Sequence, residues 1–160
     1  MTTITPCLWF DGNAEEAANY YVALFPDSRI DGVDRSPADY PSGKAGDAIT
    51  VQFTLAGRPF QGLNGGPHFK FNEAISMSIS VEGQAEADRL TNALSAVPEA
   101  EQCGWVKDKF GLSWQIVPKE FVKLMRDPDP ARAKRAMEAM MQMKRIDIAK
   151  AQAAVEGAGQ

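Results

Sequence analysis

Asp11-Gly12-Asn13-Ala14-Glu15 near the start of the chain returns as Glu82-Gly83-Gln84-Ala85-Glu86, 71 positions later. Three of the five positions are identical, and the other two exchange acid for acid and amide for amide. Each copy follows a run with strand-like alternation and opens a run with helical spacing. Such internal repetition indicates an architecture built from two copies of one supersecondary unit. The sequence therefore predicts two strand–helix–strands units related by a pseudo-twofold axis.

The chain of 160 residues suits one domain made of two half-size units that share a core. Strand-like alternation is clearest over 48–55 and 75–81, where apolar residues alternate with Thr, Gln or Ser. We place unit one at about 3–66, unit two at about 73–118 and a helical appendix at about 119–156, all within a single domain, 1–160. The expected fold class is α+β.

The appendix carries a strong helix start. Asp129-Pro130 combines an N-cap residue with proline in the first turn. We expect a short helix at Phe121–Met125, and then one long helix from Ala131 to about Val155.

The strands have one apolar face and one polar face that lacks charge. Hydroxyl, amide, thiol and indole groups suit a lined cavity better than an outer surface, which usually carries Lys and Glu. The alternative is a face covered by another subunit. The side chains on this face include Thr5, Cys7, Trp9, Thr50, Gln52, Ser76, Ser78 and Gln115.

Composition limits the partners. A net charge of −4 and a pI near 5.0 argue against a nucleic-acid partner. No run approaches the ~20 apolar residues that a membrane-spanning helix needs. The N-terminus lacks a signal-peptide pattern, so we expect a cytoplasmic protein in which Cys7 and Cys103 are free thiols.

Catalytic and cofactor motifs are sparse. The one histidine, His68, lies near a turn and is a weak candidate metal ligand, as is Gln115. No Gly-x-Ser-x-Gly elbow occurs, and the glycine-rich turn 64–67 is not followed by a helix that could bind phosphate. Without a strand–Gly-x-Gly–helix motif, a nucleotide fold of the Rossmann type is disfavoured. We expect no cofactor, and we interpret Lys70, Glu73, Lys107 and Asp108 as solvated loop charges.

The residues resemble the PhnB-like family along nearly the whole chain. The matching stretches are Leu8-Trp9-Phe10-Asp11-Gly12-Asn13-Ala14-Glu15-Glu16-Ala17, Tyr20-Tyr21, Leu24-Phe25-Pro26, Leu63-Asn64-Gly65-Gly66-Pro67, Phe71-Asn72-Glu73-Ala74-Ile75-Ser76, Cys103-Gly104-Trp105, Asp108-Lys109-Phe110-Gly111, Ser113-Trp114-Gln115-Ile116-Val117-Pro118 and Gln142-Met143-Lys144-Arg145-Ile146-Asp147-Ile148.

The resemblance implies membership of the vicinal oxygen chelate superfamily, with glyoxalase I, extradiol dioxygenases and bleomycin-resistance proteins. It implies paired βαβββ units that form a half-open barrel around a cavity, and a homodimer that in some members exchanges strands. The superfamily's metal-ligand positions fall near Thr5, Gln61 or Gly62, Ser76 and Gln115, which adds Gln61 to the candidate cavity residues. Two neutral amides without imidazole or carboxylate make a poor divalent-cation site.

Two hypotheses of function follow. The first is a protein that binds a small organic molecule in the polar cavity without a firm metal site, with tryptophans as stacking surfaces. The second is an enzyme on the same cavity. It would be either metal-dependent and glyoxalase- or dioxygenase-like, or the 3-demethylubiquinone-9 3-methyltransferase that some family members are named for.

Overall fold

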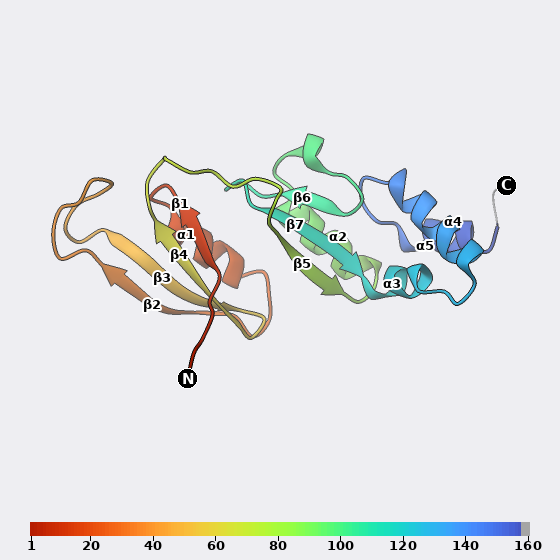
Figure 1. Cartoon of the computed structure of the whole chain (residues 1–160), viewed down its shortest axis with the longest axis horizontal. Helices are drawn as coiled ribbons and strands as arrows, with labels where there is room; N and C mark the ends of the chain where they lie inside the picture. The colour runs from red at the N-terminus through yellow and green to blue at the C-terminus, as the bar shows by residue number, and fades with distance from the viewer. Residues whose placement is uncertain (158–160) are drawn as a thin grey trace. The chain divides into compact units, whose positions relative to one another are not determined.

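The computed structural model describes residues 1–157, which divide into two compact units, Met1–Phe71 and the part from Asn72 onward (Figure 1). The first unit combines one helix, and the second several, with one open sheet each, and neither sheet is closed into a barrel. The expected α+β class is therefore confirmed.

The first unit has the expected βαβββ order. Its sheet has the strand order β1-β4-β3-β2, in which β1 is parallel to β4 and the other pairs are antiparallel. Gly62 in β4 allows the helix that begins at Ala14 to approach the sheet closely, because a Cβ on residue 62 would lie 3.2 Å from the Cβ of Ala14. The elements are β1 (Cys7–Phe10), α1 (Ala14–Val22), β2 (Arg29–Arg35), β3 (Ala48–Leu55) and β4 (Arg58–Asn64).

The core of the first unit lies between α1 and one face of this sheet. Small alanines and one tyrosine on α1 are fully buried, and they pack on apolar side chains that alternate along the strands. Burying apolar side chains is the main stabilising term of such a layer. The buried set is Leu8, Phe10, Ala14, Ala17, Ala18, Tyr21, Val51, Phe53 and Leu55.

The repeated pentapeptide is the switch from strand to helix. Gly12 and Gly83 occupy equivalent positions and both have a φ of +81°. Residues with a Cβ rarely adopt this left-handed conformation, so glycine is needed to turn the chain between strand and helix. The N-terminus of α1 is hydrogen-bonded to a side chain of β4, since the Ala14 N–H donates to Asn64 Oδ1 at 2.9 Å.

The second unit follows the same plan with one strand fewer. Its sheet has the order β5-β7-β6, with β5 parallel to β7 and β6 antiparallel to it. The strand β6 begins only at Trp105, because Cys103 and Gly104 both have positive φ, at 52° and 85°. The elements are β5 (Ser76–Val81), α2 (Gln84–Leu94), the 3₁₀ helix η1 (Pro98–Ala100), β6 (Trp105–Lys107) and β7 (Ser113–Pro118).

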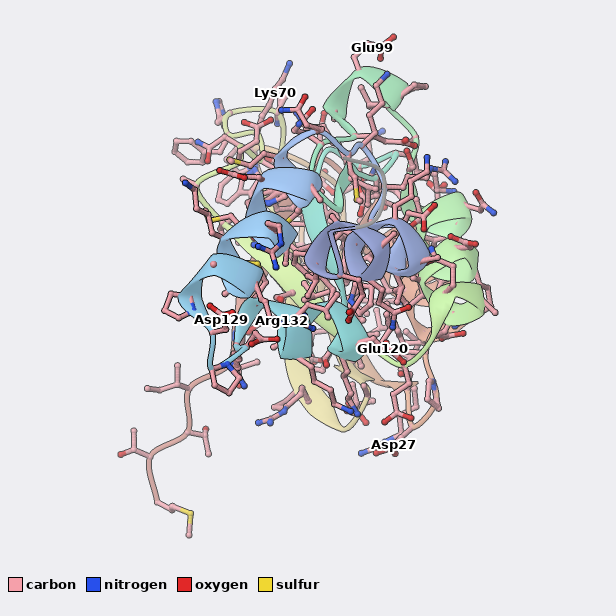
Figure 2. All side chains as sticks on the ribbon, turned by 90° about the vertical axis from the view of Figure 1, so that its right-hand side faces the viewer. Asp27, Lys70, Glu99, Glu120, Asp129 and Arg132 are labelled. Carbon is pink, nitrogen blue, oxygen red and sulfur yellow. The ribbon has the colours of Figure 1, made fainter. Side chains whose placement is uncertain are left out.

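Three helices follow β7: α3 (Lys119–Met125), α4 (Pro130–Met141) and α5 (Ile148–Val155). They share a small apolar core that contains Phe121, Ala136, Ile146, Ala151 and Val155. The helix start predicted at Asp129-Pro130 is confirmed, since Asp129 Oδ1 accepts the Ala131 N–H at 2.9 Å; Figure 2 labels Asp129 with Arg132.

The single long helix expected from Ala131 to Val155 is wrong. The chain leaves the helix after Met141, and a new helix starts at Asp147, whose side chain accepts the Lys150 N–H at 2.9 Å. Between the two helices, the Met143 and Lys144 carbonyls accept the Cys103 and Gly104 N–H groups at 2.8 and 3.0 Å. These tertiary bonds replace the helical bonds that a continuous helix would have made.

No helix within residues 1–157 is both long enough and apolar enough to cross a membrane.

We predict that Asn64→Ala destabilises the protein by about 2–3 kcal/mol, because its buried side chain satisfies two backbone groups. Besides accepting from Ala14, its Nδ2 donates to the Ala48 carbonyl at 2.9 Å. Chemical denaturation measures the free energy of unfolding. Asn19→Ala, on the exposed face of α1, is the control and should change that free energy by less than about 0.5 kcal/mol. Equal effects of the two substitutions would contradict the assigned role of Asn64.

Candidate functional site

The polar face of the first sheet carries most of the candidate residues of that unit. Strand register places Cys7 beside Gln61, and Gln61 beside Gln52 on the following strand. One step along, Trp9 lies beside Leu63, and Leu63 beside Thr50. Because alternate residues share a face, these side chains lie opposite the apolar set that packs under α1. The sheet thus brings Cys7, Trp9, Thr50, Gln52 and Gln61 together.

This face carries a carboxylate that the sequence did not indicate. Thr50 Oγ1 and Gln52 Nε2 both donate to Asp34 Oδ2 on β2, at 2.7 and 2.8 Å. These bonds, first from Thr50 and then from Gln52, hold the pKa of Asp34 below its ordinary value. Gly32 leaves room for the amide, because a Cβ there would lie 3.3 Å from Gln52 Oε1. The expectation of an uncharged face is therefore wrong at the β2 edge.

Asp34 was missed because β2 has a weak strand pattern, interrupted by Asp31-Gly32. The alternation of residues along β2 was the available signal. Asp34 lies two positions after Gly32 and so on the same face, and the strand register places Gly32 beside Gln52 and Asp34 beside Thr50.

The glycine-rich turn after β4 seats a tryptophan. Trp9 Nε1 donates to the Gly66 carbonyl at 2.8 Å, and the ring meets Phe69 edge-on with 4.9 Å between centroids. A Cβ on Gly65 would lie 2.3 Å from the indole, so only glycine fits beneath it. The turn thus has a packing role, which agrees with its rejection as a phosphate loop.

Cys7 is a free cysteine at the start of β1. The residue is exposed, and desolvation by neighbouring parts of the chain raises the pKa of the thiol above its ordinary value. The thiolate is the form that ligates metals and acts as nucleophile, and this shift disfavours it.

The second sheet presents a similar but smaller set. Gln115 lies beside Ser78 on β5 and beside Trp105 on β6. Its Nε2 donates to Ser76 Oγ at 2.9 Å, which orients the amide along the face. Ser76, Trp105 and Gln115 are half-buried, whereas Ser78 is exposed.

In both sheets, a glutamine lies beside a small polar residue at an equivalent position of the strand register. Cys7 and Ser78 are 71 positions apart, the same offset as the repeated pentapeptide. Cys7 lies beside Gln61 on the parallel strand β4, and Ser78 lies beside Gln115 on the parallel strand β7. Each unit thus sets a glutamine amide next to a small polar side chain.

Other candidates lie outside these faces. Thr5 is exposed and precedes β1, and His68 is exposed in the loop after β4. His68 belongs to the first unit and Gln115 to the second. Within residues 1–157, no group of three or more His, Cys, Asp or Glu residues is placed to hold a metal ion.

Asp108 is a structural residue, and its interpretation as a solvated charge is wrong. Its side chain is 1% exposed, and it accepts the Phe110 and Leu112 N–H groups at 2.8 and 3.0 Å. Trp114 Nε1 donates to its other oxygen at 2.8 Å, so this indole faces the core. A buried carboxylate is tolerated because donors surround it.

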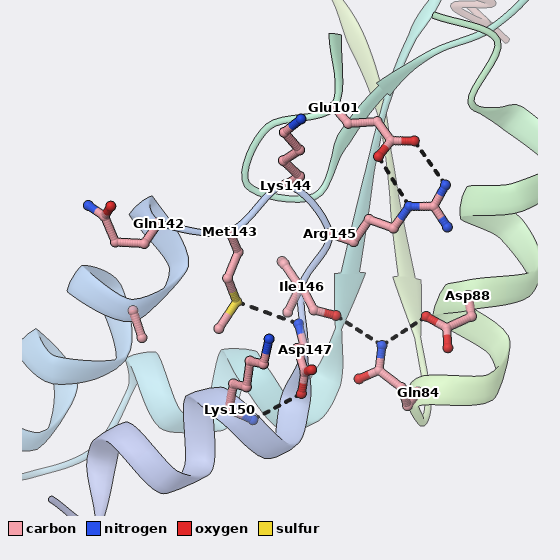
Figure 3. Close-up of a pocket in the computed structure, with 11 residues that line it drawn as sticks. Gln84, Asp88, Glu101, Gln142, Met143, Lys144, Arg145, Ile146, Asp147 and Lys150 are labelled. Carbon is pink, nitrogen blue, oxygen red and sulfur yellow. Dashed lines mark hydrogen bonds and ion pairs between the residues drawn. The ribbon is translucent and has the colours of Figure 1, made fainter. Parts of the chain in front are cut away.

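Two pockets lie away from the candidate residues. One, of about 320 Å³ in the first unit, is lined in part by Glu15, Arg35, Tyr40 and Ser42. The other, of about 760 Å³ in the second unit, lies where the 142–147 segment meets α2 and α5 (Figure 3). None of the nine candidate cavity residues lines either pocket.

An ion pair closes one side of the larger pocket. Arg145 binds Glu101 through two bonds, Nη2 to Oε1 at 2.9 Å and Nε to Oε2 at 3.1 Å. Arg145, and after it Ser95, hold the pKa of Glu101 below its ordinary value by hydrogen bonding. The same bonding to Glu101 raises the pKa of Arg145.

Two α+β units, each with an open sheet and the same strand–helix switch, make up the described part of the chain. The family model described as 3-demethylubiquinone-9 3-methyltransferase matches residues 2–117. The chain belongs to this family, the PhnB-like proteins.

Solved structures agree with this assignment. A Bacillus cereus PhnB protein, described as a candidate 3-demethylubiquinone-9 3-methyltransferase, is 33% identical with a TM-score of 0.62, over 73% of this chain and 99% of that one. Protein PA1353 from Pseudomonas aeruginosa is 21% identical with a TM-score of 0.56, over 74% of this chain and 98% of that one, and supports the fold alone. No functionally curated protein matches the chain.

We predict that the free energy of unfolding falls on acidification, and that Glu101→Gln reduces this fall. A carboxyl whose pKa is lowered by folding stabilises the protein above its ordinary pKa of 4.5, and this stabilisation is lost as the pH falls through the folded value. For this half-exposed pair the loss should be of the order of 1 kcal/mol. Urea unfolding at a series of pH values measures it.

The control for this prediction is Glu99→Gln, which removes an equal charge from an exposed position close by in the chain (Figure 2). Equal changes of the pH dependence in both variants would contradict the assigned role of the Glu101–Arg145 pair.

Proposed function

We propose that this protein binds a small organic molecule on the polar faces of its sheets, without a firm metal site. The observation that carries the proposal is the repeated pair, Cys7 with Gln61 and Ser78 with Gln115, at one register in both units. A glutamine amide both donates and accepts hydrogen bonds, so each pair can orient a carbonyl or hydroxyl group.

Half-buried indoles flank both pairs. Trp9 lies next to the Cys7–Gln61 pair on β1, and Trp105 lies directly beside Gln115. Binding sites for small molecules combine aromatic walls with a few placed polar groups. A planar ligand with one or two oxygen atoms suits this combination, and Thr50 and Gln52 add polar groups on the first sheet.

Donor chemistry argues for a metal-free site. By the family resemblance, the positions that carry His, Glu or Gln in glyoxalase-type metal enzymes fall near Thr5, Gln61 or Gly62, Ser76 and Gln115 here. Neutral hydroxyl and amide groups bind divalent transition metals weakly. We propose further that the protein is a cytoplasmic homodimer, and that it binds neither nucleic acid nor membranes.

A second candidate function is catalytic. The family description names a methyltransferase, and the Bacillus cereus relative carries the same description. This reading requires binding of S-adenosylmethionine by a chain without a strand–Gly-x-Gly–helix motif. A metal-dependent enzyme of the glyoxalase or dioxygenase type would have to rely on His68 and Gln115.

We predict saturable quenching of tryptophan fluorescence by 1-naphthol or catechol, two neutral aromatic probes that can stack and form hydrogen bonds. Gln61→Ala and Gln115→Ala should each weaken binding by roughly five- to tenfold, because each removes a hydrogen-bonding amide worth about 1 kcal/mol. Gln152→Ala, on an exposed part of α5, is the matched control and should leave the affinity unchanged. Linear, non-saturating quenching that is the same in all variants would contradict the proposal.

The catalytic alternatives are tested on the same preparation. Elemental analysis of protein purified without added metal should find substoichiometric metal, and calorimetry with S-adenosylmethionine should show no saturable heat. Stoichiometric metal that is lost in Gln115→Ala would favour the metal-dependent enzyme. Saturable S-adenosylmethionine binding would favour the methyltransferase.

A further inference from the structure

The larger pocket of the second unit is built by a fixed segment of chain. Residues 142–147 are held from two sides. Cys103 and Gly104 donate backbone bonds to the Met143 and Lys144 carbonyls, while Gln84 Nε2 donates to the Ile146 carbonyl at 3.0 Å. A ligand that enters therefore meets walls that are already ordered, which lowers the entropic cost of binding.

Gly104, which immediately precedes β6, completes this anchoring. A Cβ on Gly104 would lie 2.9 Å from Ile146 Cδ1 and 2.9 Å from the Ile116 carbonyl oxygen. Ile146 is 6% exposed and forms the apolar floor beneath the segment. The pocket thus has an apolar base as well as a charged rim.

Each carboxylate around the pocket already has a donor. Glu101 is bound by the Arg145 guanidinium, and Asp88 Oδ1 accepts the Gln84 amide at 2.9 Å. Asp147 Oδ1 accepts the Lys150 backbone N–H at 2.9 Å as the N-cap of α5. Figure 3 shows these bonds, with Arg145 turned toward Glu101. These three carboxylates therefore already accept hydrogen bonds from groups of the protein.

Two lysine ammonium groups at the pocket form no comparable side-chain interaction in the described part of the chain. Lys144 and Lys150 line the pocket, and both are exposed. Neither has an ion pair or side-chain hydrogen bond in the described part of the chain, although Lys144 is near enough to Glu101 to help lower its pKa. In Figure 3 the Lys150 side chain extends toward the 142–147 segment.

The geometry points to a second ligand site in this pocket, for a small organic anion whose carboxylate or phosphate group meets Lys150, while Lys144 lies at another part of the rim. The apolar part of the anion would contact Ile146 and Met143. The volume of about 760 Å³ lies within the range of small-molecule sites. The site is separate from the polar sheet faces and does not depend on the function proposed for them. It also uses chain beyond residue 117, where the match to the family model ends.

Amide NMR of the full-length protein tests this site, with benzoate and phenyl phosphate as probes at constant ionic strength. We expect saturable shifts for residues 142–150 and for Gln84 and Asp88. Benzamide, which has the shape of benzoate without its charge, should produce none. Lys150→Gln should weaken anion binding by about fivefold, the usual scale for one partly exposed charge contact, and Lys144→Gln should weaken it less.

The matched control is Lys134→Gln. This lysine is 74% exposed on α4, where it pairs with Glu138 at 3.7 Å and does not line the pocket. It should leave the affinity unchanged. Comparing benzoate with phenyl phosphate identifies which anionic group is preferred. Three outcomes would overturn the site: no saturable shift with either anion, equal binding of benzamide, or equal effects of all three lysine substitutions. These outcomes would leave the proposed binding of a neutral aromatic ligand near Gln61 or Gln115 unaffected, because that proposal is tested separately.

Discussion

The packing of α1 and α2 onto the apolar faces of their sheets determines where the polar side chains of the strands can lie. Once Val51 and Phe53 are buried under α1, alternation forces Thr50 and Gln52 to the other face. A shift of one residue in register would bury the amides and expose the core. The functional proposal depends on this constraint, because it creates a face rich in hydroxyl and amide groups in each unit.

Two glycines at equivalent points of the chain allow each helix to turn back onto its sheet. Gly12 and Gly83 share a φ of +81°, and each connects the first strand of its unit to the helix that covers the sheet. The same offset of 71 residues relates Cys7 to Ser78, and both lie beside a glutamine on a parallel strand. The repeat that is visible in the sequence thus continues into the geometry of the polar faces.

Much of this could be predicted from sequence, because alternation and turn residues are local signals. The α+β class and the strands at 48–55 and 76–81 follow from them. The break in the C-terminal helix could not be predicted so readily, since bonds to Cys103 and Gly104 stabilise it from far along the chain. For the same reason the donors of Asp108, and the Glu101–Arg145 pair 44 residues apart, became visible only in three dimensions.

The central claim is that the glutamines of the polar faces, and not the rest of the surface, bind the ligand. The most direct measurement is NMR of the glutamine side-chain amides in the full-length protein while catechol is added. The account predicts that the Nε2 resonances of Gln61 and Gln115 each shift and saturate, while that of the exposed Gln152 stays in place. Saturable shifts confined to other residues, with Gln61 and Gln115 unmoved, would contradict it.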